Sequence, residues 1–225
     1  MKKFLIILSC VLLAGVIGVV SYIMLVEKTI PLDLIPEKVS AFVSNYTFAD
    51  LNDPQTIPEI GIHYTNVCDN YNPDYKKDIT ITKQGSPDMK FVEKSKITDP
   101  TGNTVTSNKT LYVDGSDYYI QLENNDPVIL NEESWKKTVK EEYDILSEFF
   151  DFDNGGKIRD ELVDMYDNHK KEVTQKGSTV KCILEKDDTN ITIIYDINTN
   201  KIKSFTKVVK TNSEITNYSH FEFNY

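Results

Sequence analysis

The three histidines are the side chains of this sequence best suited to proton transfer near neutral pH. His63, His169 and His220 lie far apart along the chain, and none stands at the spacing of a metal-ligand motif. The sequence also contains no G-x-S-x-G, H-E-x-x-H, C-x-x-C or glycine-rich phosphate-binding motif. We therefore interpret the histidines as surface residues, and we predict a protein that is not an enzyme and holds no cofactor.

A short acidic segment from Asp151 to Gly156 has a superficial likeness to a calcium loop. An EF-hand loop that starts at Asp151 needs an oxygen ligand at residue 155 and a glutamate at residue 162. These positions hold Gly155 and Leu162. The segment is therefore predicted to be a solvated turn between two helices, and no metal site is predicted.

An aromatic stripe at helical spacing is the most specific feature that remains. Trp135, Tyr143, Phe149 and Phe150 recur on one face of a predicted helix. The stripe has two interpretations: a helix packed on a sheet, or a lid over a cavity for an acyl chain or similar apolar ligand. Tyr119, in an aromatic strand before this helix, completes the five candidate ligand-binding residues.

Two cysteines lie outside the N-terminal apolar run, Cys68 and Cys182. Cys182 alternates with Val180 and Leu184 on the apolar face of a predicted strand, and Cys68 ends a short apolar run. In an exported domain such a pair tends to oxidise. Two interpretations therefore remain open: a Cys68–Cys182 disulfide, or two buried free thiols. We take the disulfide as the candidate.

An uncharged run, residues 4–26, dominates the N-terminus and contains no proline. As a helix with a rise of ~1.5 Å per residue it reaches ~35 Å, enough to cross a bilayer core of ~30 Å. Lys2 and Lys3 precede the run, which favours a cytoplasmic N-terminus. We predict a single-pass anchor in residues 1–28 and one extracytoplasmic domain in residues 29–225.

Two other interpretations of this run stay open. A cleaved secretory signal would leave the domain secreted or periplasmic, although the run is longer than is usual for such a signal. A lipoprotein signal would end at Cys10, but only a few apolar residues precede that cysteine.

The charge of the chain bears on its partners. The formal net charge is −10, and such a surface repels nucleic acid. The 13 tyrosines and 10 phenylalanines suit a β-rich core or a lined cavity. We therefore predict no nucleic-acid partner.

The apolar periodicity changes several times along the chain and predicts the order of elements. A helix is expected near residues 36–46, and alternating segments predict strands at 77–83, 89–98, 105–113, 118–122 and 127–130. A helical pattern then covers 131–150, and a second helix runs from about 158 to 171. The last fifty residues read as strands and turns. This order predicts an α+β domain with helices on one face of a curved antiparallel sheet.

Two stretches resemble the lipoprotein-carrier superfamily, the fold of the LolA, LolB and LppX proteins. The segment 111–119, LYVDGSDYY, is similar to that family's hairpin of strand, Asp-Gly and aromatic strand. The segment 195–202, YDINTNKI, with the strand that ends at 221–224, resembles the family's closing turn and strand. The resemblance implies a half-barrel whose concave face is plugged by helices.

Two functions are therefore expected. One is a membrane-anchored extracytoplasmic binding domain for a lipid or other apolar ligand. The alternative is a non-enzymatic cell-surface interaction or structural domain with a filled core.

Overall fold

The structure is a computed structural model, and it describes residues 26–225 except 36, 52, 54, 56, 69–73, 83–88 and 213. The predicted membrane segment, residues 4–26, lies almost wholly outside the described residues. Within the described part, no helix is both long and apolar enough to cross a membrane. The anchor therefore stays a prediction.

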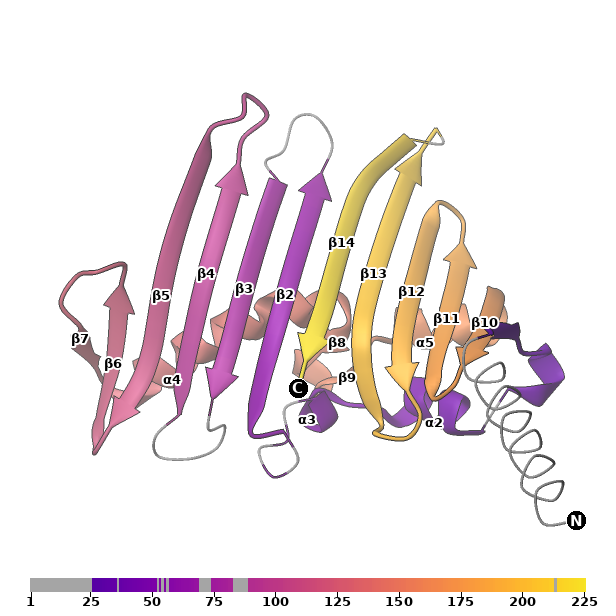
Figure 1. Cartoon of the computed structure of the whole chain (residues 1–225), viewed down its shortest axis with the longest axis horizontal. Helices are drawn as coiled ribbons and strands as arrows, with labels where there is room; N and C mark the ends of the chain where they lie inside the picture. The colour runs from indigo at the N-terminus through magenta and orange to yellow at the C-terminus, as the bar shows by residue number, and fades with distance from the viewer. Residues whose placement is uncertain are drawn as a thin grey trace, which may run out of the picture.

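Twelve strands form one open antiparallel sheet (Figure 1), in the order β1-β10-β11-β12-β13-β14-β2-β3-β4-β5-β6-β7. Their bounds are β1 Lys28–Thr29, β2 Glu59–Cys68, β3 Asp74–Thr82, β4 Lys90–Thr98, β5 Thr104–Asp114, β6 Asp117–Leu122, β7 Val128–Leu130, β10 Lys170–Lys176, β11 Thr179–Lys186, β12 Thr189–Asp196, β13 Lys201–Thr211 and β14 Glu214–Asn224.

The sheet is made of two consecutive meanders joined side by side. The first runs from β2 to β7 and the second from β10 to β14, and the last strand β14 pairs with β2. Phe221 of β14 lies opposite Tyr64 of β2, so residues distant in sequence share the centre of the sheet. The sheet does not close into a barrel.

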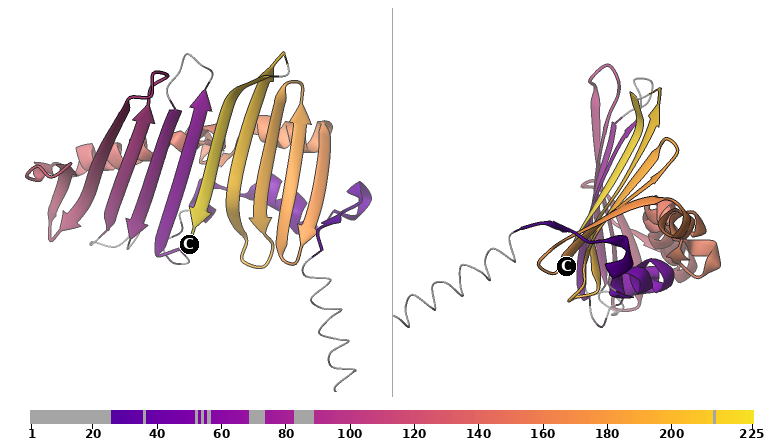
Figure 2. Two further views of the ribbon diagram at one scale, coloured as in Figure 1. Left: turned by 45° about the horizontal axis from the view of Figure 1, so that its top comes forward. Right: turned by 90° about the vertical axis from the view of Figure 1, so that its right-hand side faces the viewer.

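Helices cover only one face of this sheet (Figure 2). They are η1 Leu32–Leu34, α2 Glu37–Asn45, α3 Phe48–Leu51, α4 Glu132–Tyr143, η2 Asp144–Glu148, η3 Phe152–Asn154 and α5 Asp160–Asn168, with a small hairpin of β8 Phe150–Asp151 and β9 Lys157–Ile158 among them. The α+β class with an antiparallel sheet and helices on one face is thus confirmed.

The core lies between this helical layer and the sheet. Side chains alternate between the two faces of a strand, so every second residue of each central strand points to the helices. Ile79, Ile81, Phe91 and Leu111 are at most 1 % exposed on that face. Val39, Phe42 and Val43 of α2, and Tyr46 just after it, recur at helical spacing, and all four are buried.

The helix predicted for 131–150 is wrong in its second half. α4 ends at Tyr143, a 3-10 turn continues to Glu148, and Phe150 enters strand β8. A tight turn reverses the chain after β8, where Gly156 has a φ of 70° and a Cβ there would lie 2.9 Å from Phe48 Cβ. The apolar stripe stays buried although the helix has ended, because packing against the core overrides the local helix propensity. The sequence pattern also failed to predict strand β10, where a helix was expected to continue to about residue 171.

The predicted Cys68–Cys182 disulfide is wrong. Cys182 is a buried free thiol in β11, whereas Cys68 ends β2, and β12, β13 and β14 lie between these strands. At ~4.8 Å between neighbouring strands, the two backbones are roughly 19 Å apart. A disulfide requires Cα atoms within ~7 Å.

We expect Cys182 to resist alkylation in the folded protein. The residue is 4 % exposed, and burial raises the pKa of its thiol to about 12, although Lys171 acts to lower it. The smaller thiolate fraction alone slows the reaction about a thousandfold. Peptide mapping after iodoacetamide treatment measures this, with guanidinium-unfolded protein as the control. Equal labelling of Cys182 in both states would contradict the buried position.

Candidate functional site

Three of the predicted ligand-binding aromatics lie together under the helices. Phe149 and Phe150 have no exposed surface, and Tyr143 is 8 % exposed. The rings of Phe149 and Phe150 are 4.6 Å apart, and Phe48 of α3 lies 4.9 Å from Tyr143. Phe149 also lies 4.6 Å from Phe205 of β13. These side chains therefore fill the space between helices and sheet.

The other two predicted residues lie apart from that group. Trp135, near the start of α4, packs 5.4 Å from Tyr118 of β6, and its indole N–H is buried without a hydrogen-bond partner. Tyr119 follows Tyr118 on the strand, so its side chain points to the opposite face, where it stacks on Tyr112 at 5.0 Å. Tyr119 and Trp135 therefore lie on different sides of the sheet.

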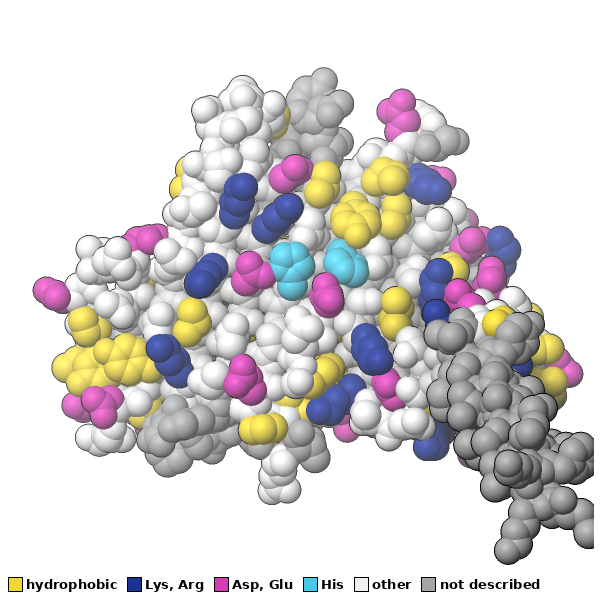
Figure 3. Space-filling view, in the orientation of Figure 1, with side chains coloured by type: hydrophobic (Ala, Val, Ile, Leu, Met, Phe, Trp, Pro, Cys, Tyr) yellow, Lys and Arg dark blue, Asp and Glu magenta, His cyan; other side chains and the backbone are white. Residues whose placement is uncertain are grey.

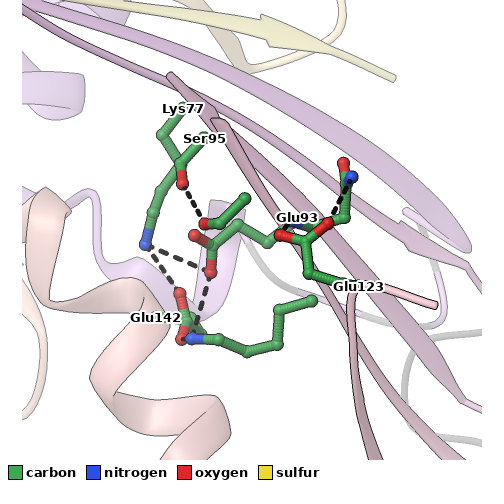
Figure 4. Close-up of polar contacts among 8 residues, drawn as sticks. Lys77, Glu93, Ser95, Glu123 and Glu142 are labelled. Carbon is green, nitrogen blue, oxygen red and sulfur yellow. Dashed lines mark hydrogen bonds and ion pairs between the residues drawn. The ribbon is translucent and has the colours of Figure 1, made fainter. Parts of the chain in front are cut away.

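A buried cluster of four charged residues lies where α4 meets strands β3, β4 and β5 (Figure 4). Glu142 is the last helical residue but one, and its Oε2 accepts a hydrogen bond of 2.6 Å from Lys77 of β3. Its Oε1 accepts another from Lys109 of β5. Glu93 of β4 contributes Oε2, which lies 3.4 Å from Lys77 Nζ and 3.2 Å from Lys109 Nζ.

The four groups differ in exposure. The side chains of Lys77, Glu93 and Glu142 are 8, 6 and 5 % exposed, while Lys109 is 26 % exposed. Glu93 Oε2 is buried and in ion-pair contact with both ammonium groups, but it makes no hydrogen bond. Charged groups removed from water in this way are stable only when they compensate one another.

The pKa values of the two carboxyl groups shift in opposite directions. Burial raises the pKa of Glu93, and the neighbouring Glu142 raises it further, against the opposite effect of the lysines. Burial also acts to raise the pKa of Glu142, but hydrogen bonds with Glu93, Lys109 and Lys77 outweigh this and hold it well below its ordinary value. The surroundings therefore favour the ionised form of Glu142 more strongly than that of Glu93.

Sequence reasoning missed this cluster, although a signal for it exists. Lys77 stands on the same strand face as Ile79 and Ile81, and Glu93 and Lys109 are each two residues from a core position, Phe91 and Leu111. Charged residues at inward positions of three successive strands indicate a buried polar group. Only their register places the charges in contact.

A second polar group lies on the face turned away from the helices, where two histidines are visible side by side (Figure 3). His63 of β2 bonds Asp78 through Nδ1, and its Nε2 lies 3.4 Å from Thr65 Oγ1. His220 of β14 lies beside it and bonds Thr206 at 2.8 Å. Burial lowers the pKa of His220. The histidines are thus at the surface, as predicted.

The alignment of Asp78, His63 and Thr65 resembles a relay for nucleophilic catalysis, but the surrounding sheet does not suit acyl transfer. Such chemistry needs backbone N–H groups aimed at a developing oxyanion. β2 is flanked by β14 and β3, and its backbone N–H groups take part in these ladders. We therefore assign no reaction to this group.

Metal binding has no support among the described residues, where no three His, Cys, Asp or Glu side chains could hold an ion. The calcium-like segment forms a capped turn instead. Asp151 accepts hydrogen bonds of 3.2 Å from the backbone N–H groups of Asp153 and Asn154.

A groove of about 900 Å³ lies beside the N-terminal end of the described chain. We call it the strap groove, because residues 28–34 form one wall and the β10–β11 turn forms another. More than half of its lining surface is apolar, and Leu34 at its rim is 66 % exposed. It is lined by Lys28, Thr29, Ile30, Pro31, Leu34, Gln175, Lys176, Gly177, Ser178, Ile197 and Asn198.

No protein-family model matches the chain, and no curated protein matches it either.

Proposed function

We propose that the chain is a non-enzymatic, membrane-tethered extracytoplasmic domain that binds the acyl chain of a lipid in the strap groove. The observation that carries this proposal is the groove itself. Its volume of about 900 Å³ falls in the range of small-molecule sites, which are mainly apolar with a few polar groups. The half-barrel of the lipoprotein-carrier superfamily, which the sequence resembles, belongs to the same proposal. The proposed ligand site is the strap groove and not the aromatic stripe.

The position of the groove supports a lipid rather than a water-soluble ligand. Its first lining residue, Lys28, follows the predicted membrane segment 4–26 by two positions. A groove this close to a membrane anchor meets lipid at high local concentration. Lys28 and Lys176 line it as well, and ammonium groups at a membrane surface attract anionic headgroups.

The first test is photo-crosslinking in vesicles. The full-length protein is reconstituted with a phosphatidylglycerol analogue that carries a diazirine in its acyl chain. Peptides containing residues 28–34 and 175–178 are expected to carry the label after irradiation. Label confined to residues 4–26 would contradict a lipid site in the groove.

Leu34 and Leu32 form a matched pair for this test. Both are exposed residues of one 3-10 turn, but only Leu34 lines the groove. Leu34→Asp is expected to lower labelling of 175–178 about tenfold, the loss expected when an apolar contact of ~1.5 kcal/mol is removed. Leu32→Asp should leave the labelling unchanged. An equal loss in both variants would mean general membrane contact.

Trp135 tests the competing location under the helices. It is the only tryptophan and lies on α4, which packs against β6, whereas the groove lies beside β10. Its fluorescence should therefore not change when lipid is added. A blue shift at saturating lipid would instead favour a lipid site beneath the helices, lined by the aromatic stripe.

The second candidate function is an interaction domain with a filled core. One observation favours it: Phe149 and Phe150, predicted to line a cavity, have no exposed surface. Absence of any groove label in the vesicle experiment would leave this candidate.

A further inference from the structure

A second cavity adjoins the strap groove, and we call it the α2 pocket because Lys38, Phe42 and Asn45 of α2 form one side of it. Its volume is about 440 Å³, and it meets the strap groove at Ile197 and Asn198, which line both cavities. Polar groups make up a larger share of its lining than in the strap groove. Two adjoining cavities of this kind suit an amphiphile, with its apolar part in one and its polar part in the other.

Hydrogen bonds fix the ridge between the two cavities. Asp196 accepts a bond of 2.9 Å from the backbone N–H of Asn198 and another of 3.0 Å from the Ser178 hydroxyl. From the α2 side, Lys38 Nζ donates to the Ile197 carbonyl at 3.4 Å. These bonds tie the β10–β11 turn, the ridge and α2 together. Because Asn198 is exposed, a ligand seated in the strap groove can extend over the ridge into the α2 pocket.

Lys38 supplies the positive charge of the α2 pocket. Its ammonium group makes the single long bond to the Ile197 carbonyl, and within the described part of the chain no carboxylate lies within ion-pair distance of it. The chain as a whole carries a net charge of −10, so an ammonium group without a carboxylate partner stands out at a cavity. Lysine side chains in such positions bind phosphate oxygens.

Three asparagine side chains give the pocket its hydrogen-bonding capacity. They are Asn45, Asn198 and Asn200. The Tyr195 hydroxyl donates to Asn200 Oδ1 at 2.5 Å, so the NH₂ group of that amide is left to donate to a ligand. An amide both donates and accepts, as a hydroxyl group does. The lining therefore fits a phosphate that carries hydroxyl groups better than the bare carboxylate of a fatty acid.

Asp50 limits the negative charge that the pocket can accept. It lines the α2 pocket, and its Oδ2 accepts bonds from the backbone N–H and the hydroxyl of Thr47 at 2.8 and 2.9 Å. A phosphomonoester carries a charge of about −2 near neutral pH, and a carboxylate nearby repels it. A phosphodiester carries a single negative charge, which the Lys38 ammonium balances.

We propose that the α2 pocket binds the headgroup of the lipid whose acyl chain lies in the strap groove, and that this headgroup is a hydroxylated phosphodiester, as in phosphatidylglycerol. Lys38 binds the phosphate, and the asparagine amides bind the hydroxyl groups. The inference rests on the proposed function, because the acyl chain in the strap groove brings the headgroup to the ridge.

Photo-crosslinking from the headgroup tests the inference. The full-length protein is reconstituted in vesicles with a phosphatidylglycerol analogue that carries its diazirine in the headgroup, and residues 198–200 are expected to carry the label. Acyl-chain label at 175–178 without headgroup label at 198–200 would overturn this inference and leave the strap groove as the lipid site. Absence of both labels would overturn both proposals.

Lys38→Met separates the two cavities. It is expected to lower headgroup labelling of 198–200 about tenfold, because a hydrogen bond from a charged donor is lost, while acyl-chain labelling of 175–178 is unchanged. Lys140→Met removes the same charge from an exposed residue of α4 that lines neither cavity, and it should change neither label. Equal loss of both labels in Lys38→Met would overturn the headgroup site and indicate general attraction to an anionic membrane.

Water-soluble glycerophosphoglycerol distinguishes a lipid from a free phosphodiester. It has the headgroup of phosphatidylglycerol but no acyl chain. In excess it should leave most of the headgroup label at 198–200 in place, since the acyl chain holds the lipid in the adjoining groove. Complete displacement of the label would overturn the lipid assignment in favour of a site for the free phosphodiester.

Discussion

Replacement of Glu142 by alanine is expected to lower the free energy of unfolding by about 3–5 kcal/mol. Glu142 accepts hydrogen bonds from both Lys77 and Lys109, and it is 5 % exposed. Its removal leaves buried ammonium groups without their carboxylate partner. Lys77 and Lys109 both lose this partner.

Urea denaturation followed by circular dichroism measures this loss, and Glu141→Ala is the matched control. Glu141 is the preceding residue of α4, is 57 % exposed and pairs with Lys137 at 3.8 Å. An exposed pair of this kind contributes ~0.5 kcal/mol or less. If both variants lost the same small amount, the buried cluster would contribute no more than the surface pair.

The pH dependence gives a further measure of the same variant. Burial acts to raise the pKa of Glu142, but its hydrogen bonds outweigh this and hold the pKa at about 2, below its ordinary value of 4.5. A lowered folded-state pKa gives stability that is present above the unfolded pKa and is lost as the pH falls. The difference between wild type and Glu142→Ala should therefore shrink between pH 4.5 and 2. A difference that grew in acid would contradict this charge assignment.

Replacement of Phe149 by alanine is expected to cost about 3–5 kcal/mol as well, for a different reason. Phe149 has no exposed surface and lies between Phe150 and Phe205, with ring centroids 4.6 Å away on each side. It joins the helical layer to β13. The variant leaves a cavity between Phe150 and Phe205.

Phe152→Ala is the control for that loss. Phe152 belongs to the same hairpin region but is only partly buried. Its removal should cost clearly less, about 1–2 kcal/mol, since less apolar surface leaves water there. Thermal unfolding of both variants gives the comparison. A small loss for Phe149 with gain of lipid binding under the helices would instead indicate a cavity that opens.

The sequence alone determined the character of most elements. Alternation of Val180, Cys182 and Leu184 predicted strand β11, and the helix expected near residues 36–46 is α2. These signals are local: which face of a strand or helix is apolar depends on residues a few positions apart. The N-cap of α4 is a local contact of the same kind, since the side chain of Asn131 accepts a hydrogen bond of 2.8 Å from the backbone N–H of Ser134.

Only the tertiary structure decided which elements became neighbours. The pairing of β14 with β2 joins segments far apart in sequence, and it separates Cys68 from Cys182 by three strands. The register of β3, β4 and β5 under α4 brings Lys77, Glu93 and Glu142 into contact. Strand order and register follow from packing of whole layers, which no short window of sequence contains. For that reason the aromatic stripe could be found in advance, but the buried charges beside it could not.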